Sequence, residues 1–221
     1  MTPIRTIIVD DDALILAGLT TIIDSHPDLV VVARSEDGRE LVELVHSHRP
    51  DVVLVDIRMP YRDGLEAIAD LRAAQVDVKV VVLTTFAEHD YFARAVELDV
   101  DGYLLKSSSP AELAAAVRAV AAGGAVLSPP VARWLLDAGG SHAARRGLAM
   151  RRIAALTGRQ RDVLALITEG ASNAEIGERL YLSEATVKGY VSEILTRLDV
   201  RRRVQAAILA HEAQMPNQQD V

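Results

Sequence analysis

Short apolar runs alternate with amphipathic stretches over the first 125 residues. A run rich in Val and Ile is typical of a buried strand, and apolar residues spaced by three and four positions indicate a helix. The pattern predicts five strands, at residues 4–9, 29–33, 52–56, 78–84 and 103–105, with a helix after each. Five such units in succession indicate an α/β fold with a doubly wound parallel sheet.

The pattern changes after Gly123 and Gly124. A short helix is expected over Pro129–Leu136, and residues 138–147 have the composition of a linker. The rest is predicted to be helical, because side-chain caps open three helical patterns in a row. These caps are Thr157 with Gln160, Ser172 with Glu175, and Ser183. We therefore expect a first domain over 1–125, a linker over 126–152, a small all-α domain over 153–214 and a disordered tail over 215–221.

Composition and charge narrow the possible functions. Cysteine is absent, which excludes disulfides, a thiol nucleophile and cysteine-ligated zinc. No apolar run approaches the ~18 residues of a membrane span, and the N-terminus does not resemble a signal peptide, so we expect a cytoplasmic protein with no membrane contact. The net charge of −7 is unevenly distributed, since residues 1–125 carry −10 and residues 126–221 carry +3. An acidic part joined to a mildly basic part indicates two modules with different partners.

Polar side chains stand at the ends of four predicted strands. Asp10 and Asp11 end the first, Asp56 the third, Thr84 the fourth and Lys106 the fifth. These ends meet at one edge of a doubly wound sheet, where ligands bind. Two carboxylates about 4 Å apart repel by roughly 4 kcal/mol at an effective dielectric of ~20, so such a cluster needs a cation. Oxygen ligands suit Mg²⁺, and the set favours phosphoryl transfer to a carboxylate.

Simpler interpretations of these residues stay open at this point. A single Asp at a strand end is more often a helix cap or a turn residue, and the acidic run at 10–12 could be a solvated helix N-terminus. A lone lysine after a strand is uninformative. The combination of all five residues is much harder to obtain by chance.

Residues 4–122 resemble the receiver domain of response regulators, which has a flavodoxin-like sheet. The resemblance lies in VDDD (9–12), VDIRMPYRDG (55–64), LTT (83–85) and GYLLK (102–106). It implies that Asp56 accepts a phosphoryl group from a sensor histidine kinase and that Thr84 and Lys106 contact this group. It further implies that Tyr103 reorients on activation, although Tyr103 could also be a packing residue. The implied Mg²⁺ ligands are Asp10, Asp11, Asp56 and the backbone carbonyl of Arg58.

The chain departs from the receiver pattern in two places. Tyr61 and Arg62 replace a small or apolar pair before Asp63, which alters the surface beside Asp56. Ser107 stands where many receivers have proline, so the cis peptide found there in many receivers is not expected. Neither departure removes a residue of the implied site.

The caps of the last part predict a helix-turn-helix, in which the longer helix enters the major groove of DNA. In the helix that follows Ser183, apolar residues at spacings of three and four form one stripe: Val187, Val191, Ile194, Leu195 and Leu198. The opposite face is small and polar: Ala185, Lys188, Gly189, Ser192 and Thr196. A helix bundle that binds proteins would show a similar pattern, so the residues alone leave both open.

Residues 156–212 closely resemble the LuxR-type helix-turn-helix of the NarL/FixJ response regulators. The resemblance lies in LTGRQRDVLALITEGASNAEIGERL, LSEATVKGYVSEILTRLDV and RVQAAILAH. It implies that Lys188 contacts DNA, with Thr186, Gly189 and Ser192 beside it in the groove. Arg201, Arg202 and Arg203 are expected to contact phosphates. The final helix is the implied dimer surface, through Ala206, Ala207, Leu209 and Ala210.

Two residues depart from this second pattern. Gln160 replaces the usual glutamate, but it can still close the capping box. Gly189 costs about 1 kcal/mol relative to alanine within a helix. Either this cost is simply tolerated, or glycine stands there because it lets the backbone approach DNA.

The sequence thus predicts a two-component response regulator, which is a DNA-binding transcription regulator. Phosphorylation of Asp56 with Mg²⁺ would promote homodimerisation and binding to double-stranded promoter DNA. It would be no enzyme beyond catalysing its own phosphorylation and dephosphorylation. One alternative is a hydrolase with an aspartyl-phosphate intermediate, which needs a second acid where Arg58 stands. Another is a receiver that is insensitive to phosphate.

Overall fold

The computed structural model describes residues 2–85, 89–127 and 149–213. The chain forms two compact units, Met1–Ala121 and Ala122–Val221. The expected helix at Pro129–Leu136, the linker residues 138–147 and the tail at 215–221 lie outside the described residues.

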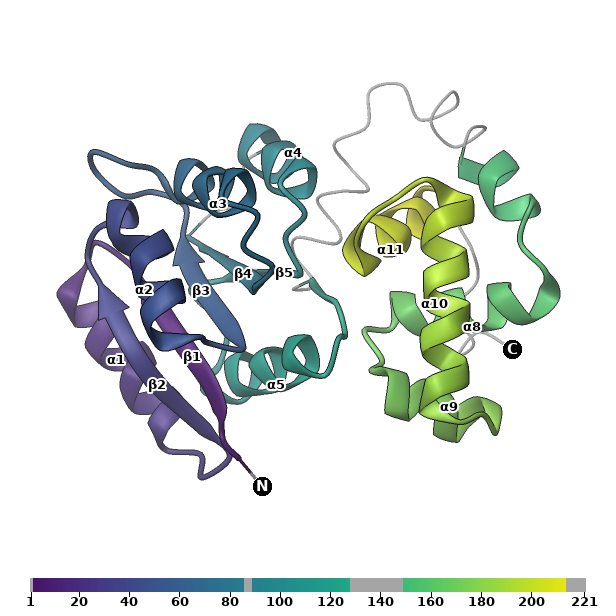
Figure 1. The fold of residues 1–221 in the computed structure, drawn as a ribbon, viewed down its shortest axis with the longest axis horizontal. Coiled ribbons are helices and arrows are strands. Elements are labelled where there is room, and N and C mark those ends of the chain that lie inside the picture. The colour runs from purple at the N-terminus through teal and green to yellow at the C-terminus, as the bar shows by residue number, and fades with distance from the viewer. Residues whose placement is uncertain (1, 86–88, 128–148, 214–221) are drawn as a thin grey trace. The chain divides into compact units, whose positions relative to one another are not determined.

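The first unit is built on a parallel sheet with helices on both faces. The strand order is β2-β1-β3-β4-β5-β6, and the strands from β1 to β5 pair in parallel. Helices α1 and α5 cover one face, and α2, α3 and α4 cover the other (Figure 1). In chain order the elements of this unit are β1 (Ile4–Val9), α1 (Ala13–Asp24), β2 (Leu29–Ser35), a 3-10 turn (Gly38–Glu40), α2 (Leu41–His48), β3 (Val52–Asp56), α3 (Gly64–Ala73), β4 (Lys79–Thr84), α4 (His89–Glu97), β5 (Gly102–Leu105) and α5 (Pro110–Ala121). The sixth strand of the sheet, β6 (Val126–Leu127), follows the boundary at Ala121.

Burial explains why the apolar runs became strands. β3 is buried at every residue from Val52 to Asp56, and β4 is buried from Val80 to Thr84, because helices cover both faces of the sheet. The flavodoxin-like fold and the strand order are therefore as the sequence indicates. The prediction of five strands was one strand short, because the two residues of β6 are too few to show a period.

The second unit is helical. Its elements are α8 (Gly158–Thr168), α9 (Asn173–Leu180), α10 (Glu184–Leu198) and α11 (Arg203–Glu212), and residues 149–154 are helical as well. The predicted capping boxes open α8 and α9, and the Ser183 side chain caps α10. α9 and α10 are joined by a turn of three residues, so the helix-turn-helix predicted from the spacing is present.

One core holds the helices of this unit together. It contains buried residues of all four helices, including Val163, Leu164, Ile176, Val187, Ile194, Leu198, Ala206 and Ala210. Within the described part of the chain, no helix has the length and apolar character that a membrane span requires.

Candidate functional site

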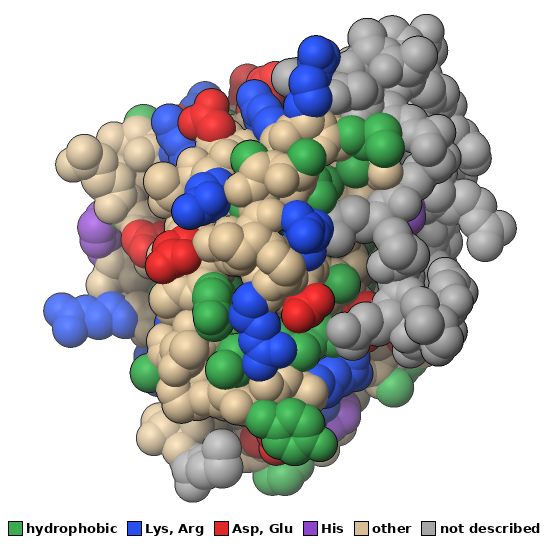
Figure 2. Space-filling view, turned by 90° about the vertical axis from the view of Figure 1, so that its right-hand side faces the viewer, with side chains coloured by type: hydrophobic (Ala, Val, Ile, Leu, Met, Phe, Trp, Pro, Cys, Tyr) green, Lys and Arg blue, Asp and Glu red, His purple; other side chains and the backbone are tan. Residues whose placement is uncertain are grey.

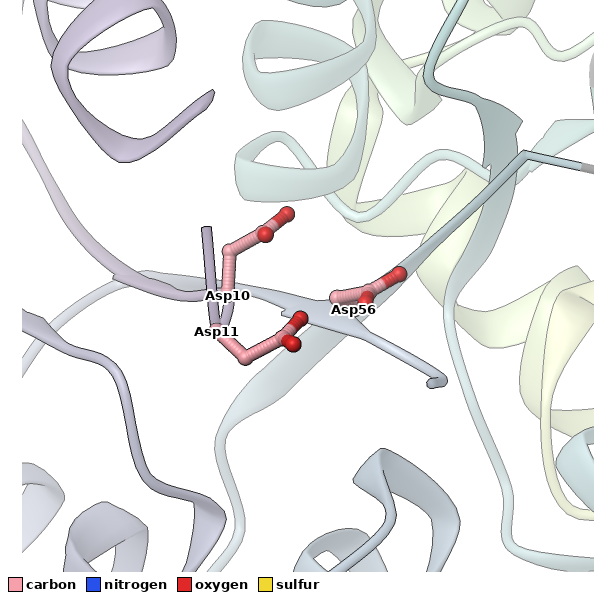
Figure 3. Close-up of side chains that lie close together, drawn as sticks. All are labelled: Asp10, Asp11 and Asp56. Carbon is pink, nitrogen blue, oxygen red and sulfur yellow. The ribbon is translucent and has the colours of Figure 1, made fainter. Parts of the chain in front are cut away.

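Three carboxylates lie together at the carboxyl edge of the sheet. Asp10 and Asp11 follow β1, and Asp56 is the last residue of β3, which pairs with β1 (Figure 3). One carboxylate oxygen of each residue lies within 4.8 Å of one oxygen of each of the other two. Asp10 is fully buried and Asp56 is 3% exposed, whereas Asp11 is exposed. The cluster predicted from the strand ends is therefore present.

The third acid of the run at 10–12 has a different role. Asp12 is the N-cap of α1, and its Oδ1 accepts hydrogen bonds from the backbone N–H of Leu14 at 2.8 Å and of Ile15 at 3.3 Å. The helix-cap interpretation thus holds for Asp12, while Asp10 and Asp11 face the cluster. Asp10 also accepts the N–H of Asp12 at 3.1 Å, which fixes its carboxylate.

Lys106 supplies the one cation that contacts this cluster among the described residues. Its Nζ lies 2.6 Å from Asp10 Oδ2 and 3.1 Å from Asp56 Oδ1. Burial alone would lower the pKa of Lys106, but the hydrogen bond to Asp10 and the charge of Asp56 outweigh it and raise this pKa. One ammonium thus faces three carboxylates, which leaves the edge of the sheet with an excess of negative charge.

The carboxyl of Asp56 is perturbed by its surroundings. Burial raises its pKa from 3.8 to about 6; Lys106 opposes this rise, and the charges of Asp10 and Asp11 add to it. A carboxylate that is costly to keep charged, at the mouth of a parallel sheet, is a candidate reactive group.

Thr84 lies on β4, which pairs with β3, and Tyr103 lies on β5, which pairs with β4. Thr84 ends β4 and is buried, whereas Thr85 is exposed, so Thr84 is the hydroxyl of this pair that belongs to the interior. Tyr103 on β5 is fully buried. Burial raises the pKa of its phenol to about 12, and a hydrogen bond with Thr84 opposes this rise. The hydroxyl of Thr84 thus lies near enough to affect the phenol of the predicted switch residue.

The loop after Asp56 comes close to the strand end. A Cβ on Gly64 would lie 1.9 Å from the carbonyl oxygen of Asp56, so only glycine fits at the start of α3.

Three side chains of this loop make contacts of their own. Tyr61 has a φ of 69° and is 91% exposed, with the guanidinium of Arg39 over its ring at 5.7 Å. Arg62 pairs with Asp70 on α3 at 2.5 Å. Arg58 is exposed, with its guanidinium 5.7 Å from the centroid of a tyrosine ring on α4, and metal binding through its carbonyl stays a prediction.

In the helical unit, α10 presents the two faces that its sequence predicts. Val187, Val191, Ile194 and Leu198 are buried and Leu195 is half-buried. The opposite face is exposed and consists of Ala185, Lys188, Gly189, Ser192 and Thr196. No atom lies within 4 Å of the position that a Cβ on Gly189 would take. Thr186 is exposed as well, and its hydroxyl lies 2.7 Å from the hydroxyl of Ser183.

The predicted DNA-contacting groups of α10 make contacts within the helix. Lys188 Nζ lies 2.9 Å from a carboxylate oxygen of Glu184, one turn earlier. The Ser192 hydroxyl donates to the carbonyl of Lys188 at 3.0 Å. An exposed pair of this spacing is worth only about 0.3–0.5 kcal/mol, so Lys188 can leave Glu184 at little cost.

Gln160 makes a contact that its place in a capping box does not predict. Its Oε1 accepts the N–H of Thr157 at 3.0 Å, and its Nε2 donates to Glu193 on α10 at 2.8 Å. A glutamate here could close the cap but could not donate to Glu193. The amide therefore ties α8 to the exposed helix.

Two expectations for the last helix were wrong. Arg203 does not face solvent, because its side chain is 8% exposed and donates to the carbonyl of Ala171 and to Asn173 Oδ1, each at 3.0 Å. Burial lowers its pKa to about 10. A guanidinium held in this way is not available to DNA phosphates.

The second expectation concerns the dimer surface. Ala206, Ala207 and Ala210 are buried in the core of their own unit, so these side chains cannot form a surface for a second copy. Leu209 is half-buried and also packs on this core. Any dimer contact of α11 has to use its other side.

Figure 2 shows Lys and Arg side chains dispersed among hydrophobic and polar ones on the face in view, with no single block of basic charge. Arg201 is exposed and Arg202 is half-buried.

Comparison with known proteins decides the family. A family model described as the response regulator receiver domain matches residues 6–118, and one described as bacterial regulatory proteins, luxR family, matches residues 154–210. The nitrate/nitrite response regulator protein NarL of Escherichia coli K12 is 34% identical over 95% of this chain and 96% of its own. The chain is a response regulator of the NarL/FixJ family. As such it is a DNA-binding transcription regulator of a two-component system.

Other relatives of this response regulator match along almost their whole length. The transcriptional regulatory protein LiaR of Bacillus subtilis is 37% identical over 97% of this chain and 100% of its own. A solved structure of the response regulator ChrA, from a heme-sensing two-component system, has 33% identity and a TM-score of 0.53, and the match covers 96% of this chain and 98% of that one.

Proposed function

We propose that this response regulator is switched by phosphorylation of Asp56 by a sensor histidine kinase, and that the modification promotes dimerisation and binding to promoter DNA. The observation that carries the proposal is the cluster at the sheet edge, where Asp10, Asp11 and Asp56 converge with Lys106. An excess of carboxylates around one lysine can bind a cation and a phosphoryl group together.

The reaction at Asp56 is a displacement at phosphorus. One carboxylate oxygen forms a bond to phosphorus while the bond from phosphorus to the donor's imidazole nitrogen breaks, and the electron pair stays on that nitrogen. Lys106 lies 3.1 Å from Asp56 Oδ1 and would neutralise charge on the transferred group. Thr84, buried at the end of the neighbouring strand, would donate its hydroxyl to a phosphoryl oxygen.

The donor set fits a hard divalent cation. Asp10, Asp11 and Asp56 offer only oxygen ligands, with one oxygen of each within 4.8 Å of the others, and the carbonyl of Arg58 is the further ligand we assign. When bound there, Mg²⁺ would offset the charge of the carboxylates and of the incoming phosphoryl group. The receiver would catalyse only the addition and removal of its own phosphoryl group.

The buried tyrosine links the phosphoryl site to the rest of the unit. Because the Thr84 hydroxyl affects the Tyr103 phenol, a new partner for this hydroxyl would change the surroundings of a fully buried side chain on β5. Such a change shifts the population between two arrangements of the β5 region, which is how we propose that the charge at Asp56 acts elsewhere.

On the helical side, we assign DNA contact to the exposed face of α10. Lys188, Thr186, Gly189 and Ser192 would lie in the major groove, with Arg201 and Arg202 on phosphates. Arg203 is left out because it is buried. Since promoter DNA is the target, we place the protein in the cytoplasm.

The test is DNA binding by the full chain with and without acetyl phosphate and Mg²⁺. Wild type is expected to bind a selected duplex more tightly after treatment, and Asp56→Asn is expected to show no response. Asp70→Asn, which changes a half-buried carboxylate on α3 outside the cluster, is the matched control and should respond as wild type does. An equal response of wild type and Asp56→Asn would contradict the switch, and sustained turnover of the donor would favour a hydrolase instead.

A further inference from the structure

Tyr181 occupies a position in the helix-turn-helix where the backbone conformation does not require a tyrosine side chain. It follows α9 with a φ of 55° and a ψ of 47°, the left-handed region that favours glycine. Its backbone N–H closes the end of α9 on the carbonyls of Glu178 and Gly177, which a glycine would do equally well. The side chain therefore has no part in the local backbone structure.

The ring of Tyr181 is also unused by the fold. It is 96% exposed, so burial does not stabilise it. Within the described ranges, no side chain stacks on the ring and none hydrogen-bonds to its hydroxyl. Tyr61 is similar in exposure and in backbone conformation, but there the guanidinium of Arg39 covers the ring. The side chain of Tyr181 is thus left available for a partner.

The turn holds the backbone of Tyr181 in a fixed place. The N–H of Leu182 donates to the carbonyl of Gly177 at 2.9 Å, and Arg159 Nη2 donates to the carbonyl of Leu180 at 2.5 Å. A Cβ on Gly177 would lie 2.8 Å from the carbonyl oxygen of Leu182, which shows how closely the turn folds back on α9. A side chain carried on such a backbone loses little conformational freedom when it binds.

The location of Tyr181 points to DNA. It stands two residues before Ser183, the cap of α10, and the N-terminal residues of a recognition helix are those that contact base edges. The residues that lead into this helix consequently come to the edge of the groove, where the sugar–phosphate backbone lies. A phenol suits this edge, because its hydroxyl donates to a phosphate oxygen and its ring packs on a deoxyribose.

We propose that Tyr181 contacts the sugar–phosphate backbone of DNA at the edge of the groove that α10 enters, and so positions the recognition helix. The inference rests on the DNA-binding face assigned under the proposed function. The exposed face of α10 has few groups that can contact phosphates, since Lys188 is the one basic residue between Ala185 and Thr196. Tyr181 would supply a further contact. An uncharged contact adds affinity and fixes the register without adding charge.

The experiment compares full-length variants on one duplex, selected from a random-sequence pool by the wild-type chain treated with acetyl phosphate and Mg²⁺. Tyr181→Gly is expected to weaken binding about tenfold, the combined effect of losing the hydrogen bond and the packing of the ring. Tyr181→Phe keeps the ring and is expected to weaken binding by about threefold. Gln75→Gly, a change at an exposed left-handed position of the other unit away from Asp56, is the control and should bind as wild type does.

A structural effect is excluded by two further readouts. Glycine is favoured at this φ, so the thermal midpoint of Tyr181→Gly should not fall below that of wild type. Because a phenol releases no counterion, the slope of log K against log salt concentration should stay unchanged.

Equal binding by wild type and Tyr181→Gly would overturn this inference and leave the proposed function standing. Equal binding by wild type and Tyr181→Phe would overturn the phosphate contact. A wild-type chain that selects no duplex would overturn both proposals.

Discussion

Replacing Asp56 by asparagine is expected to stabilise the first unit at neutral pH when no divalent cation is present. The pKa of Asp56 is raised from 3.8 to about 6, chiefly by burial, so the folded chain holds a proton that the unfolded chain has released. The free energy of unfolding therefore falls as pH rises through the window from about 4 to about 6. A rise in pKa of this size means that charged Asp56 lowers the free energy of unfolding by about 3 kcal/mol at pH 7.5. Asparagine carries no charge, so Asp56→Asn avoids this loss.

The measurement is a urea titration in EDTA at pH 4.5 and at pH 7.5. Unfolding is followed by pulse hydrogen exchange of peptides from β1 and β3, because these report on the first unit alone. The difference between Asp56→Asn and wild type should be about 1 kcal/mol at pH 4.5 and about 3 kcal/mol at pH 7.5. Asp70→Asn is the control and should differ from wild type by less than about 0.5 kcal/mol at both pH values. An Asp56→Asn chain that is no more stable than wild type at pH 7.5 would refute the reasoning.

Four further substitutions test other parts of the structure. Gly64→Ala is expected to destabilise the first unit by about 3 kcal/mol or more, because its Cβ would lie 1.9 Å from the carbonyl oxygen of Asp56; a urea midpoint equal to that of wild type would contradict this close approach. Gly189→Ala meets no atom within 4 Å and is expected to raise helix stability by about 1 kcal/mol while weakening DNA binding; unchanged binding would show that Gly189 is merely tolerated. Arg203→Ala should lower the free energy of unfolding of the second unit by about 2–4 kcal/mol and leave the salt slope of DNA binding unchanged. Arg202→Ala should leave the free energy of unfolding unchanged and reduce the salt slope by about 1. Equal salt slopes for wild type and Arg202→Ala would mean that Arg202 contacts no phosphate.

The sequence predicted the cluster at Asp56 because parallel topology brings strand ends together wherever the apolar runs are clear. Asp12 illustrates a limit, since a run of three acids does not say which one caps the helix. The contact of Gln160 with Glu193 joins two helices far apart in sequence, and no local pattern encodes it.

The burial of Arg203, in contrast, could have been predicted from the sequence. Its spacing of three, four and seven from Ala206, Ala207 and Ala210 places it on the buried stripe of α11. Charge alone suggested an exposed residue, while the acceptors that hold the guanidinium, such as the carbonyl of Ala171, become visible only in the folded unit.

The low charge of the DNA-binding face makes dimerisation important. Lys188, Arg201 and Arg202 are the basic groups that we assign to DNA, and the salt slope is about −0.9 for each phosphate neutralised. One copy is therefore expected to show a slope near −3, with low affinity, and two copies on one duplex a slope near −5. If phosphorylation acts by pairing two copies, acetyl phosphate should steepen the slope together with the gain in affinity. A gain in affinity at an unchanged slope would instead mean that each copy binds alone and that phosphorylation alters the access of α10 to DNA.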